Sequence, residues 1–232
     1  MRRVFTIIAF AIALLSCTEK LDNDDIVADT SVIADDATDL TPFSANIAVS
    51  FIPGTGVNHY WLGIVTSTEP NPTSSTVWGG EYYDEQSDKH IFEFRNLNPG
   101  TTYYYRAYAE YELVFQNKKV FDEFKSFSTP AMEPFIVTHP IETETSYVMR
   151  GSLTLDQKIV PENVTFLFSC GSRSTMTGKE TDFGTTYAET QSDGSFTAEF
   201  NWDLEKETIG FYRAGVSYRG VYYWGEEVTF TK

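Results

Sequence analysis

Few residues in this chain could do chemistry on their own. The three histidines, His59, His90 and His139, are scattered, and neither an H-E-x-x-H motif nor a His-x-His pair is present that could hold zinc. Glu226 and Glu227 are adjacent carboxylates, a pair that a glycosidase could use. On neighbouring positions of one strand they would point to opposite faces, which favours a structural role. We therefore expect no catalytic residue, no metal site and no cofactor.

Other reactive groups also lack partners in the sequence. The Ser- and Thr-rich loops contain no G-x-S-x-G elbow, and Gly79-Gly80 is followed by neither a helix nor a lysine that could cradle phosphate. Cys170 lies in an apolar segment without an evident histidine partner. We expect a buried, inert thiol there, and pairing with another chain is the alternative.

Aromatic side chains are the remaining candidates for function. They cluster in the segment VWGGEYYDE and near the end of the chain, and the candidate ligand-binding residues are Trp78, Tyr82, Tyr83, Tyr223 and Trp224. Exposed aromatic faces stack on sugar rings or anchor protein partners. The alternative is that these rings form core contacts and cross-strand pairs. Within Tyr222-Tyr223-Trp224, at least one ring must point outward unless both faces of the strand are covered.

Composition narrows the class of protein that must position these rings. The 232 residues include 33 Asp and Glu against 17 Lys and Arg, a net charge of −16, which argues against nucleic-acid binding. Charged residues make up only 22% of the chain, so it can build a core. Aromatic residues reach 16%, mostly as 14 Tyr and 18 Phe, and this bias favours strands over helices.

The N-terminus has the pattern of a signal peptide. Arg2 and Arg3 precede an apolar stretch from Val4 to Leu15, which is shorter than the ~20 residues that span a bilayer. The segment Leu14-Leu15-Ser16-Cys17 resembles the lipobox of bacterial lipoproteins. That resemblance implies a signal peptide at residues 1–16 and lipidation of Cys17, with several acyl chains, such as palmitate, holding the protein to the membrane. An ordinary secretory signal is the alternative.

An acidic segment follows the cysteine. Residues 18–36 contain seven acids and one base, and the first part should form a solvated, self-repelling linker, so we assign 17–25 as lipidated cysteine and tether. Residues 18–25 resemble the acidic export signal of surface lipoproteins in Bacteroidota, although Leu21 and Asn23 interrupt the run. The resemblance implies an outer-membrane protein that faces outward. A plain acidic spacer and a periplasmic location stay open as alternatives.

The segment NLNPGTTYYYRAYA, residues 96–109, carries the clearest fold signal. Leu97, Pro99, Gly100, Thr101 and Tyr103 match the L-x-P-G-T-x-Y signature of fibronectin type III domains. Pro99-Gly100 makes a tight turn, and Tyr103 takes the tyrosine-corner position, in which the hydroxyl bonds upstream backbone. The face that Tyr103 shares with Tyr105, Ala107 and Ala109 should be the core face, with Tyr104, Arg106 and Tyr108 opposite.

Strands with period-two alternation surround this segment. In the first half we expect them near 26–33 and at 44–51, 60–67, 77–83, 90–95, 102–111 and 119–129, and in the second at 135–138, 147–155, 164–169, 185–190, 195–200, 211–218 and 221–231. Trp61 occupies the strand in which sandwich domains commonly bury a tryptophan. Arg219-Gly220 should form a short hairpin turn.

The second half repeats the plan of the first. Residues 204–214 align with 97–107 without a gap and pair Arg213 with Arg106, but Gly210 falls where Tyr103 was and the Pro-Gly turn is missing. We therefore predict an all-β chain with two tandem fibronectin type III-like or immunoglobulin-like β-sandwiches, at 26–130 and 131–232, after a lipoprotein signal and acidic linker.

These features predict a non-enzymatic surface lipoprotein that binds an extracellular glycan or protein. The alternative is a structural spacer or accessory subunit of an outer-membrane complex, without a ligand of its own. An exposed aromatic platform would favour glycan binding, and a large flat apolar patch would favour a protein partner. Burial of every tryptophan would favour the spacer.

Overall fold

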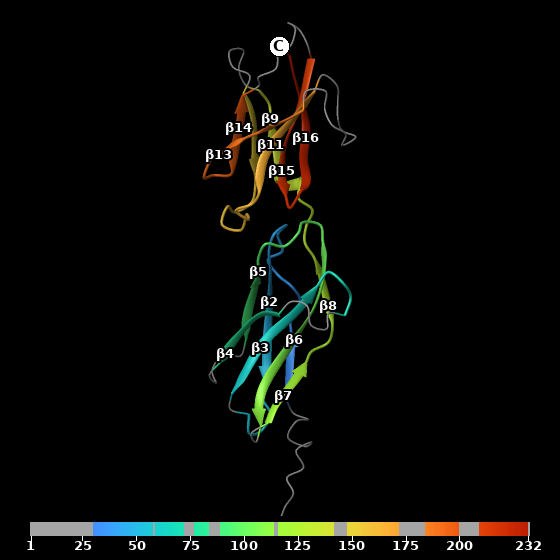
Figure 1. Ribbon diagram of the computed structural model, residues 1–232, viewed down its shortest axis with the longest axis vertical. Helices are drawn as coiled ribbons and strands as arrows, with labels where there is room; N and C mark the ends of the chain where they lie inside the picture. The colour runs from blue at the N-terminus through green and yellow to red at the C-terminus, as the bar shows by residue number, and fades with distance from the viewer. Residues whose placement is uncertain are drawn as a thin grey trace, which may run out of the picture.

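The computed structural model describes residues 30–57, 59–71, 77–83, 89–113, 116–141, 148–171, 184–199 and 209–231. Over these residues the chain forms two β-sandwiches that lie end to end along the long axis of the molecule (Figure 1). The strands pair antiparallel throughout the described residues. The expected all-β fold with tandem sandwiches is confirmed.

The first sandwich packs a three-stranded sheet against a five-stranded one. The smaller sheet has the order β1-β2-β5, with bounds Ser31–Ala34, Ala45–Ile52 and His90–Phe94. The larger sheet has the order β4-β3-β6-β7, with bounds Val77–Tyr83, Tyr60–Ser67, Thr102–Leu113 and Gln116–Phe121, and β8 (Lys125–Ser128) pairs with β6 beyond the end of β7. The chain thus passes from the smaller sheet (β1, β2) to the larger (β3, β4), returns once for β5, and ends in the larger sheet, which is the strand order of a fibronectin type III-like sandwich.

The second sandwich repeats this plan. One sheet has the order β13-β14-β10-β9, with bounds Glu189–Thr190, Ser195–Glu199, Val148–Leu153 and Ile136–His139. The other has the order β12-β11-β15-β16, with bounds Gly184–Tyr187, Thr165–Gly171, Ile209–Tyr218 and Val221–Thr231. The strand expected at 185–190 is therefore two strands, β12 and β13, which belong to different sheets.

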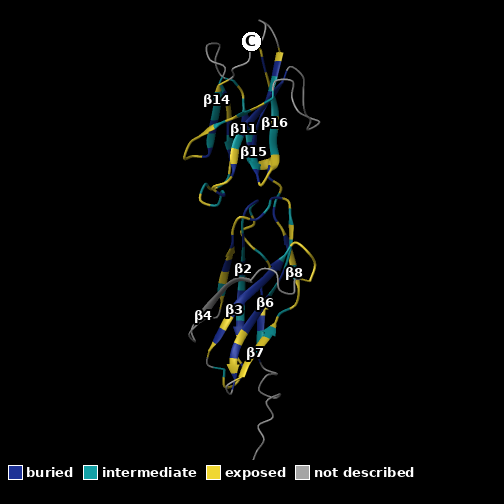
Figure 2. Cartoon of the chain, viewed as in Figure 1, coloured by how far each residue is buried: buried dark blue, intermediate teal, exposed yellow. Residues whose placement is uncertain are grey.

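Alternation along β6 places the first core where the sequence predicts it. Tyr105, Ala107 and Ala109 are fully buried between the sheets, while Arg106 lies on the outer face of the larger sheet. Figure 2 shows the resulting stripes of buried and exposed positions on neighbouring strands. Tyr108, also on the outer face, is nevertheless buried, because its ring lies over Gly63 of β3, where a Cβ atom would come within 2.4 Å of it.

The tyrosine corner is confirmed in the first sandwich. The backbone N–H of Asn98 donates to the Tyr103 hydroxyl at 2.8 Å, and the Tyr103 ring stacks on Phe127 at 5.5 Å. In the second sandwich the equivalent residue is Gly210, and the Phe230 ring occupies the space beside it, 2.3 Å from where a Cβ would stand. The second core therefore fills this corner from the last strand instead.

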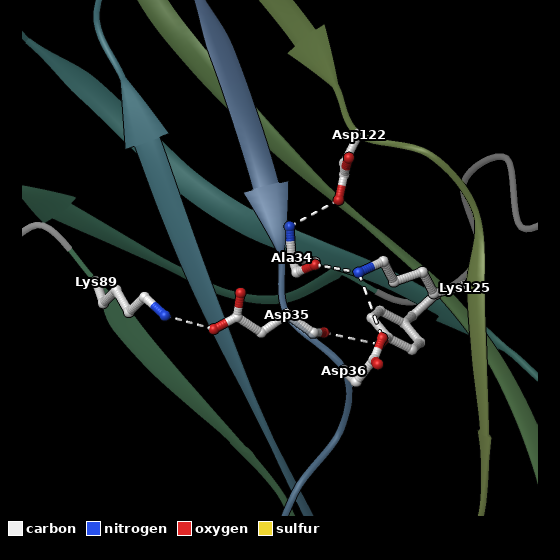
Figure 3. A network of polar contacts seen from close by, with 7 residues as sticks. Ala34, Asp35, Asp36, Lys89, Asp122 and Lys125 are labelled. Carbon is white, nitrogen blue, oxygen red and sulfur yellow. Dashed lines mark hydrogen bonds and ion pairs between the residues drawn. The ribbon is translucent and has the colours of Figure 1, made fainter.

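The last strand of the first sandwich differs from the prediction, because residues 122–124 divide it into β7 and β8. At this break the Asp122 carboxylate accepts a hydrogen bond from the Ala34 N–H at 2.7 Å, and the Lys125 ammonium donates to the Ala34 carbonyl at 2.6 Å (Figure 3). Two side chains thus satisfy backbone groups at the outer edge of β1, which would otherwise be open to another strand.

A turn from the first sandwich enters the core of the second. Phe43 is fully buried in the second core, where its ring meets Tyr218 edge-on at 5.1 Å. The Tyr218 hydroxyl donates to the Asn96 carbonyl at 3.1 Å, and Arg219 donates to the Asn98 side chain at 2.9 Å. Arg219 and Gly220 both have positive φ, as a two-residue hairpin turn requires, so the expected hairpin is confirmed. These contacts join the sandwiches through more than the linker.

Candidate functional site

Trp61 is an exposed tryptophan of the first sandwich, and this placement corrects the expectation that it is buried. Its side chain is 47% exposed, on the outer face of β3, because the neighbouring residues Tyr60 and Leu62 take the inward positions. Both of these neighbours belong to the first core. The bulky ring that fills the sandwich at this point is thus Tyr60, one residue before the expected tryptophan.

The candidate residues of β4 are placed by the backbone register. Tyr82 pairs with Trp61, Tyr83 pairs with Tyr60, and Trp78 pairs with Ile64 across a bulge. Tyr82 therefore takes the position directly opposite the exposed tryptophan on the edge strand of the larger sheet. Trp61 itself was not among the candidates selected from the sequence.

A groove of about 480 Å³ opens beside Trp61 at the end of the sheet that carries the β6–β7 turn. Its wall combines the indole with charged and polar side chains from two strands and the chain before β3: His59, Trp61, Glu110, Tyr111, Glu112, Asn117, Lys118 and Lys119. Positive and negative groups are mixed in this lining. It therefore offers one aromatic face surrounded by hydrogen-bond donors and acceptors.

Lys119 organises one side of this groove. Its ammonium lies 2.6 Å from the Glu110 carboxylate and 3.9 Å from the centroid of the Tyr108 ring. Burial raises the pKa of the Tyr108 hydroxyl, while the Lys119 charge acts in the opposite direction. The ammonium is thus held by an ion pair and a cation–π contact, so the polar wall next to Trp61 is formed before any ligand arrives.

A different arrangement surrounds Arg106, which lies on the same outer face of β6, two residues before Tyr108. Its guanidinium lies 4.1 Å from the centroid of Phe121 and 4.5 Å from that of Phe124. Phe121 ends β7, and Phe124 belongs to the break before β8. The two rings cover the guanidinium.

In the second sandwich, the sequence candidates divide between the two faces of β16. Trp224 lies on the outer face, and Tyr222 stacks parallel to it with ring centroids 6.2 Å apart. Tyr223 is partly buried and packs against the second core, on the face of β16 opposite Trp224. Tyr222, 53% exposed, is the ring that shares the outer face with Trp224. Alternation along a strand requires that Tyr223 face away from Tyr222 and Trp224, but the sequence alone did not show which of the two faces is the outer one.

A second cleft, of about 630 Å³, lies between β9 and β16. It is lined by Glu133, Pro134, Ile136, Val137, Thr138, Arg213, Trp224, Gly225, Glu226 and Glu227. The register of β15 and β16 shifts between Arg213 and Gly215, so that Gly225 and Glu226 form a bulge. The N–H of Ala214, at this irregularity, donates to the Thr138 hydroxyl at 2.9 Å, which ties β9 to the bulged sheet.

No cluster of catalytic or metal-binding groups stands out in the described part of the chain. Within those residues, no group of three or more His, Cys, Asp or Glu side chains is arranged to hold a metal ion. Cys170 is buried against the Met149 sulfur, and burial raises the pKa of its thiol, as expected for an inert core cysteine.

The predicted signal peptide (1–16), lipidation site and tether (17–25) all lie outside the described residues. Among the residues that are described, no helix has the length and apolar character needed to cross a membrane.

Comparison with known proteins adds little beyond the fold class. No protein-family model matches the chain, and no curated protein sequence does. Among solved structures, a sensor domain of the anti-sigma factor RsgI4 of Pseudobacteroides cellulosolvens shares 18% identity over 45% of this chain and 98% of its own length, with a TM-score of 0.36. A two-fibronectin type III segment of chicken tenascin shares 13% identity over 85% of this chain and 95% of its own, with a TM-score of 0.32. At these scores, the fold assignment rests on the strand order described above.

Proposed function

We propose that this protein is a non-catalytic, lipid-anchored surface protein that binds a glycan in the groove beside Trp61. The observation that carries the proposal is the half-exposed Trp61 ring in a groove lined by Glu110, Lys119 and Asn117. A sugar ring presents apolar C–H groups on its faces and hydroxyl groups around its edge. It matches a site in which one aromatic face is surrounded by fixed polar groups.

The rim of the groove favours a glycan over a protein partner. Charged side chains predominate around Trp61, with Glu112 and Lys118 beside the Glu110–Lys119 pair. Protein interfaces are depleted of lysine and glutamate at their centre and place aromatic anchors among other apolar groups. Hydroxyl groups of a sugar, by contrast, can form charge-assisted hydrogen bonds with carboxylates and ammonium groups.

A structural role is the second candidate, and the junction between the sandwiches supports it. Phe43 of the first sandwich is buried in the second core, and Tyr218 and Arg219 hydrogen-bond back to the first. Such contacts favour a stiff rod, which would hold a distal site or partner at a set distance from the membrane. In such a rod the groove beside Trp61 would lie at the tether end of the first sandwich, where the Thr30 hydroxyl accepts a hydrogen bond from the Gly54 N–H. The second sandwich would lie farther from the membrane (Figure 1).

Anchoring through Cys17 is part of the proposal and can be tested separately. Metabolic labelling with palmitate should mark the wild-type protein and should not mark Cys17→Ala, and the wild type should be in the outer-membrane fraction. Digestion by added protease on intact cells would support the outward orientation. Labelling of Cys17→Ala at the wild-type level would contradict lipidation at this residue.

A glycan array with the detergent-solubilised full chain tests the binding proposal. The wild type should bind a defined set of glycans, and Trp61→Ala should reduce the signal at least tenfold. Tyr187→Ala is a matched control, because Tyr187 is 71% exposed but lies on β12 of the second sandwich, away from the groove. Absence of binding by the wild type, or equal losses in both variants, would refute the assignment.

A further inference from the structure

Arg213 is a buried guanidinium that the fold leaves incompletely paired. It is 7% exposed, and its Nε atom makes no hydrogen bond to any described residue. The guanidinium lies 4.7 Å from the centroid of the Trp224 ring, and Arg213 lines the cleft between β9 and β16. Leaving a buried donor unpaired costs about 1–3 kcal/mol, more when it is charged, so such groups usually mark a place for water or a ligand.

The surroundings of Arg213 show what could pair with it. Burial lowers the pKa of the guanidinium, and the charge of Glu227, its cross-strand partner, acts in the opposite direction. Glu133 and Glu226 add two more carboxylates to the cleft, so acids outnumber bases there. A negatively charged ligand would be repelled. A neutral ligand with several hydroxyl groups could accept hydrogen bonds from Arg213 and donate them to the glutamates.

Trp224 provides the apolar part of the same cleft. Its ring lies over Gly215, where a Cβ atom would come within 2.4 Å of the indole, and Tyr222 stacks beside it on the outer face. The glycine lets the indole lie close to the sheet, and the cation–π contact with Arg213 holds it there. The indole is thus positioned as part of the cleft wall next to the hydrogen-bonding groups.

We infer that the cleft between β9 and β16 is a second carbohydrate-binding site, for a neutral sugar ring that stacks on Trp224 and hydrogen-bonds to Arg213. The inference rests on the proposed function, that the chain binds glycans. It adds a site of the same chemistry in the second sandwich and makes the protein bivalent. A glycan long enough, or repeated densely enough, to occupy both sites would be held more tightly than by either alone.

The equivalent arginine of the first sandwich provides the matched control. Arg106 aligns with Arg213 in the internal repeat, and its Nε atom likewise lacks a hydrogen bond within the described residues. Phe121 and Phe124 lie over Arg106, whereas Arg213 has Trp224 and the cleft. Replacing each arginine by lysine keeps the charge and removes the Nε donor and the planar fork. Only the substitution at Arg213 should affect sugar binding.

The test is calorimetric titration of the full chain in detergent with two sets of probes: neutral hexasaccharides of glucose, mannose and galactose, and an oligogalacturonate. The wild type should bind a neutral hexasaccharide at two sites, and Trp61→Ala should retain one. Adding Arg213→Lys to Trp61→Ala should weaken the remaining site at least tenfold, while adding Arg106→Lys should change it less than twofold. Thermal melts check that each variant is folded. Glu226→Gln, an exposed change at the rim, should weaken the same site about threefold and serves if Arg213→Lys does not fold.

The other outcomes separate this inference from the proposed function. One binding site that Trp61→Ala abolishes would overturn the second site and leave the first intact. Equal losses from Arg106→Lys and Arg213→Lys, or binding of the oligogalacturonate alone, would overturn the assignment of Arg213 to a neutral sugar. Absence of binding by the wild type to any probe, together with an empty glycan array, would refute both proposals.

Discussion

The two sandwiches share a strand plan but differ in how their last strand meets their first. In the first sandwich the last strand breaks after Phe121, and Asp122 and Lys125 close the free edge of β1 (Figure 3). In the second, β16 continues for 11 residues with a bulge at Gly225 and Glu226, and its first strand, β9, borders an open cleft. The edge of the first strand that faces the last strand is thus covered by side chains in the first sandwich and borders a cleft in the second.

This difference changes the surroundings of the arginine that the internal repeat places in both sandwiches, Arg106 in the first and Arg213 in the second. The break that closes β1 also brings Phe124 over Arg106, so the first sandwich covers its outward guanidinium with two phenyl rings. The continuous β16 instead gives Arg213 one ring, Trp224, and a cleft. Repetition of a residue therefore does not repeat its role. The binding surface of each sandwich depends on how its last strand is built.

The largest expected effect concerns Phe43, which comes from the first sandwich and is buried in the core of the second. Phe43→Ala should lower the free energy of unfolding by about 3–5 kcal/mol, because it removes a fully buried phenyl ring from the second core. Urea denaturation followed by tryptophan fluorescence would measure it. Leu40→Ala, in the same segment but 39% exposed, should cost under about 1 kcal/mol. Equal effects of the two changes would show that Phe43 does not join the sandwiches.

Alkaline pH should weaken both sandwiches by similar amounts. Burial raises the pKa of Tyr105 in the first core and of Tyr212 in the second to about 12. Below about pH 10 each hydroxyl is protonated in the folded and unfolded states, and stability is full. Between about pH 10 and 12 the unfolded chain loses protons that the folded chain keeps, so stability falls by about 2–3 kcal/mol per tyrosine.

Urea titrations between pH 9 and 12 measure this loss. Tyr105→Phe and Tyr212→Phe should each remove about half of the pH dependence contributed by the pair. An unchanged slope in either variant would show that the corresponding hydroxyl titrates normally, and the two cores would then differ in how they hold a tyrosine.

A smaller effect is expected at the closed edge of β1. Lys125→Ala and Asp122→Ala should each destabilise the protein by about 1 kcal/mol, because each leaves one backbone group of Ala34 without its partner. Thermal denaturation can detect this change, and Glu123→Ala, at an exposed position between them, should have little effect. If all three variants melt alike, the side chains do not close the edge.

Much of the fold is predictable because its signals are local. The Pro99-Gly100 turn and the alternation from Tyr103 to Ala109 set the core face of β6 without reference to distant residues. The hairpin at Arg219-Gly220 is likewise local. The break at residues 122–124 is not, since it is stabilised by Ala34, almost ninety residues away in sequence. The sequence therefore predicts one closing strand where the structure has two.

The candidate site was only partly predictable for the same reason. Tyr60 and Trp61 are adjacent aromatic residues, and either could fill the core when the neighbouring strands are unknown. The choice between Tyr222 and Tyr223 is equally a question of phase, which the pairing with β15 decides. Trp224 alone among the sequence candidates with described side chains lies on the outer face. Trp61 and Arg213 could not be selected from the sequence, because each lines a groove whose walls come from several strands that are distant in sequence.

The most direct test of the central claim follows the indole N–H signals of the four tryptophans by NMR during titration with a glycan selected on the array. The signal that is missing from Trp61→Ala should shift progressively on addition of the glycan to the wild type. Saturable binding of that glycan without any change in the Trp61 signal would contradict the account.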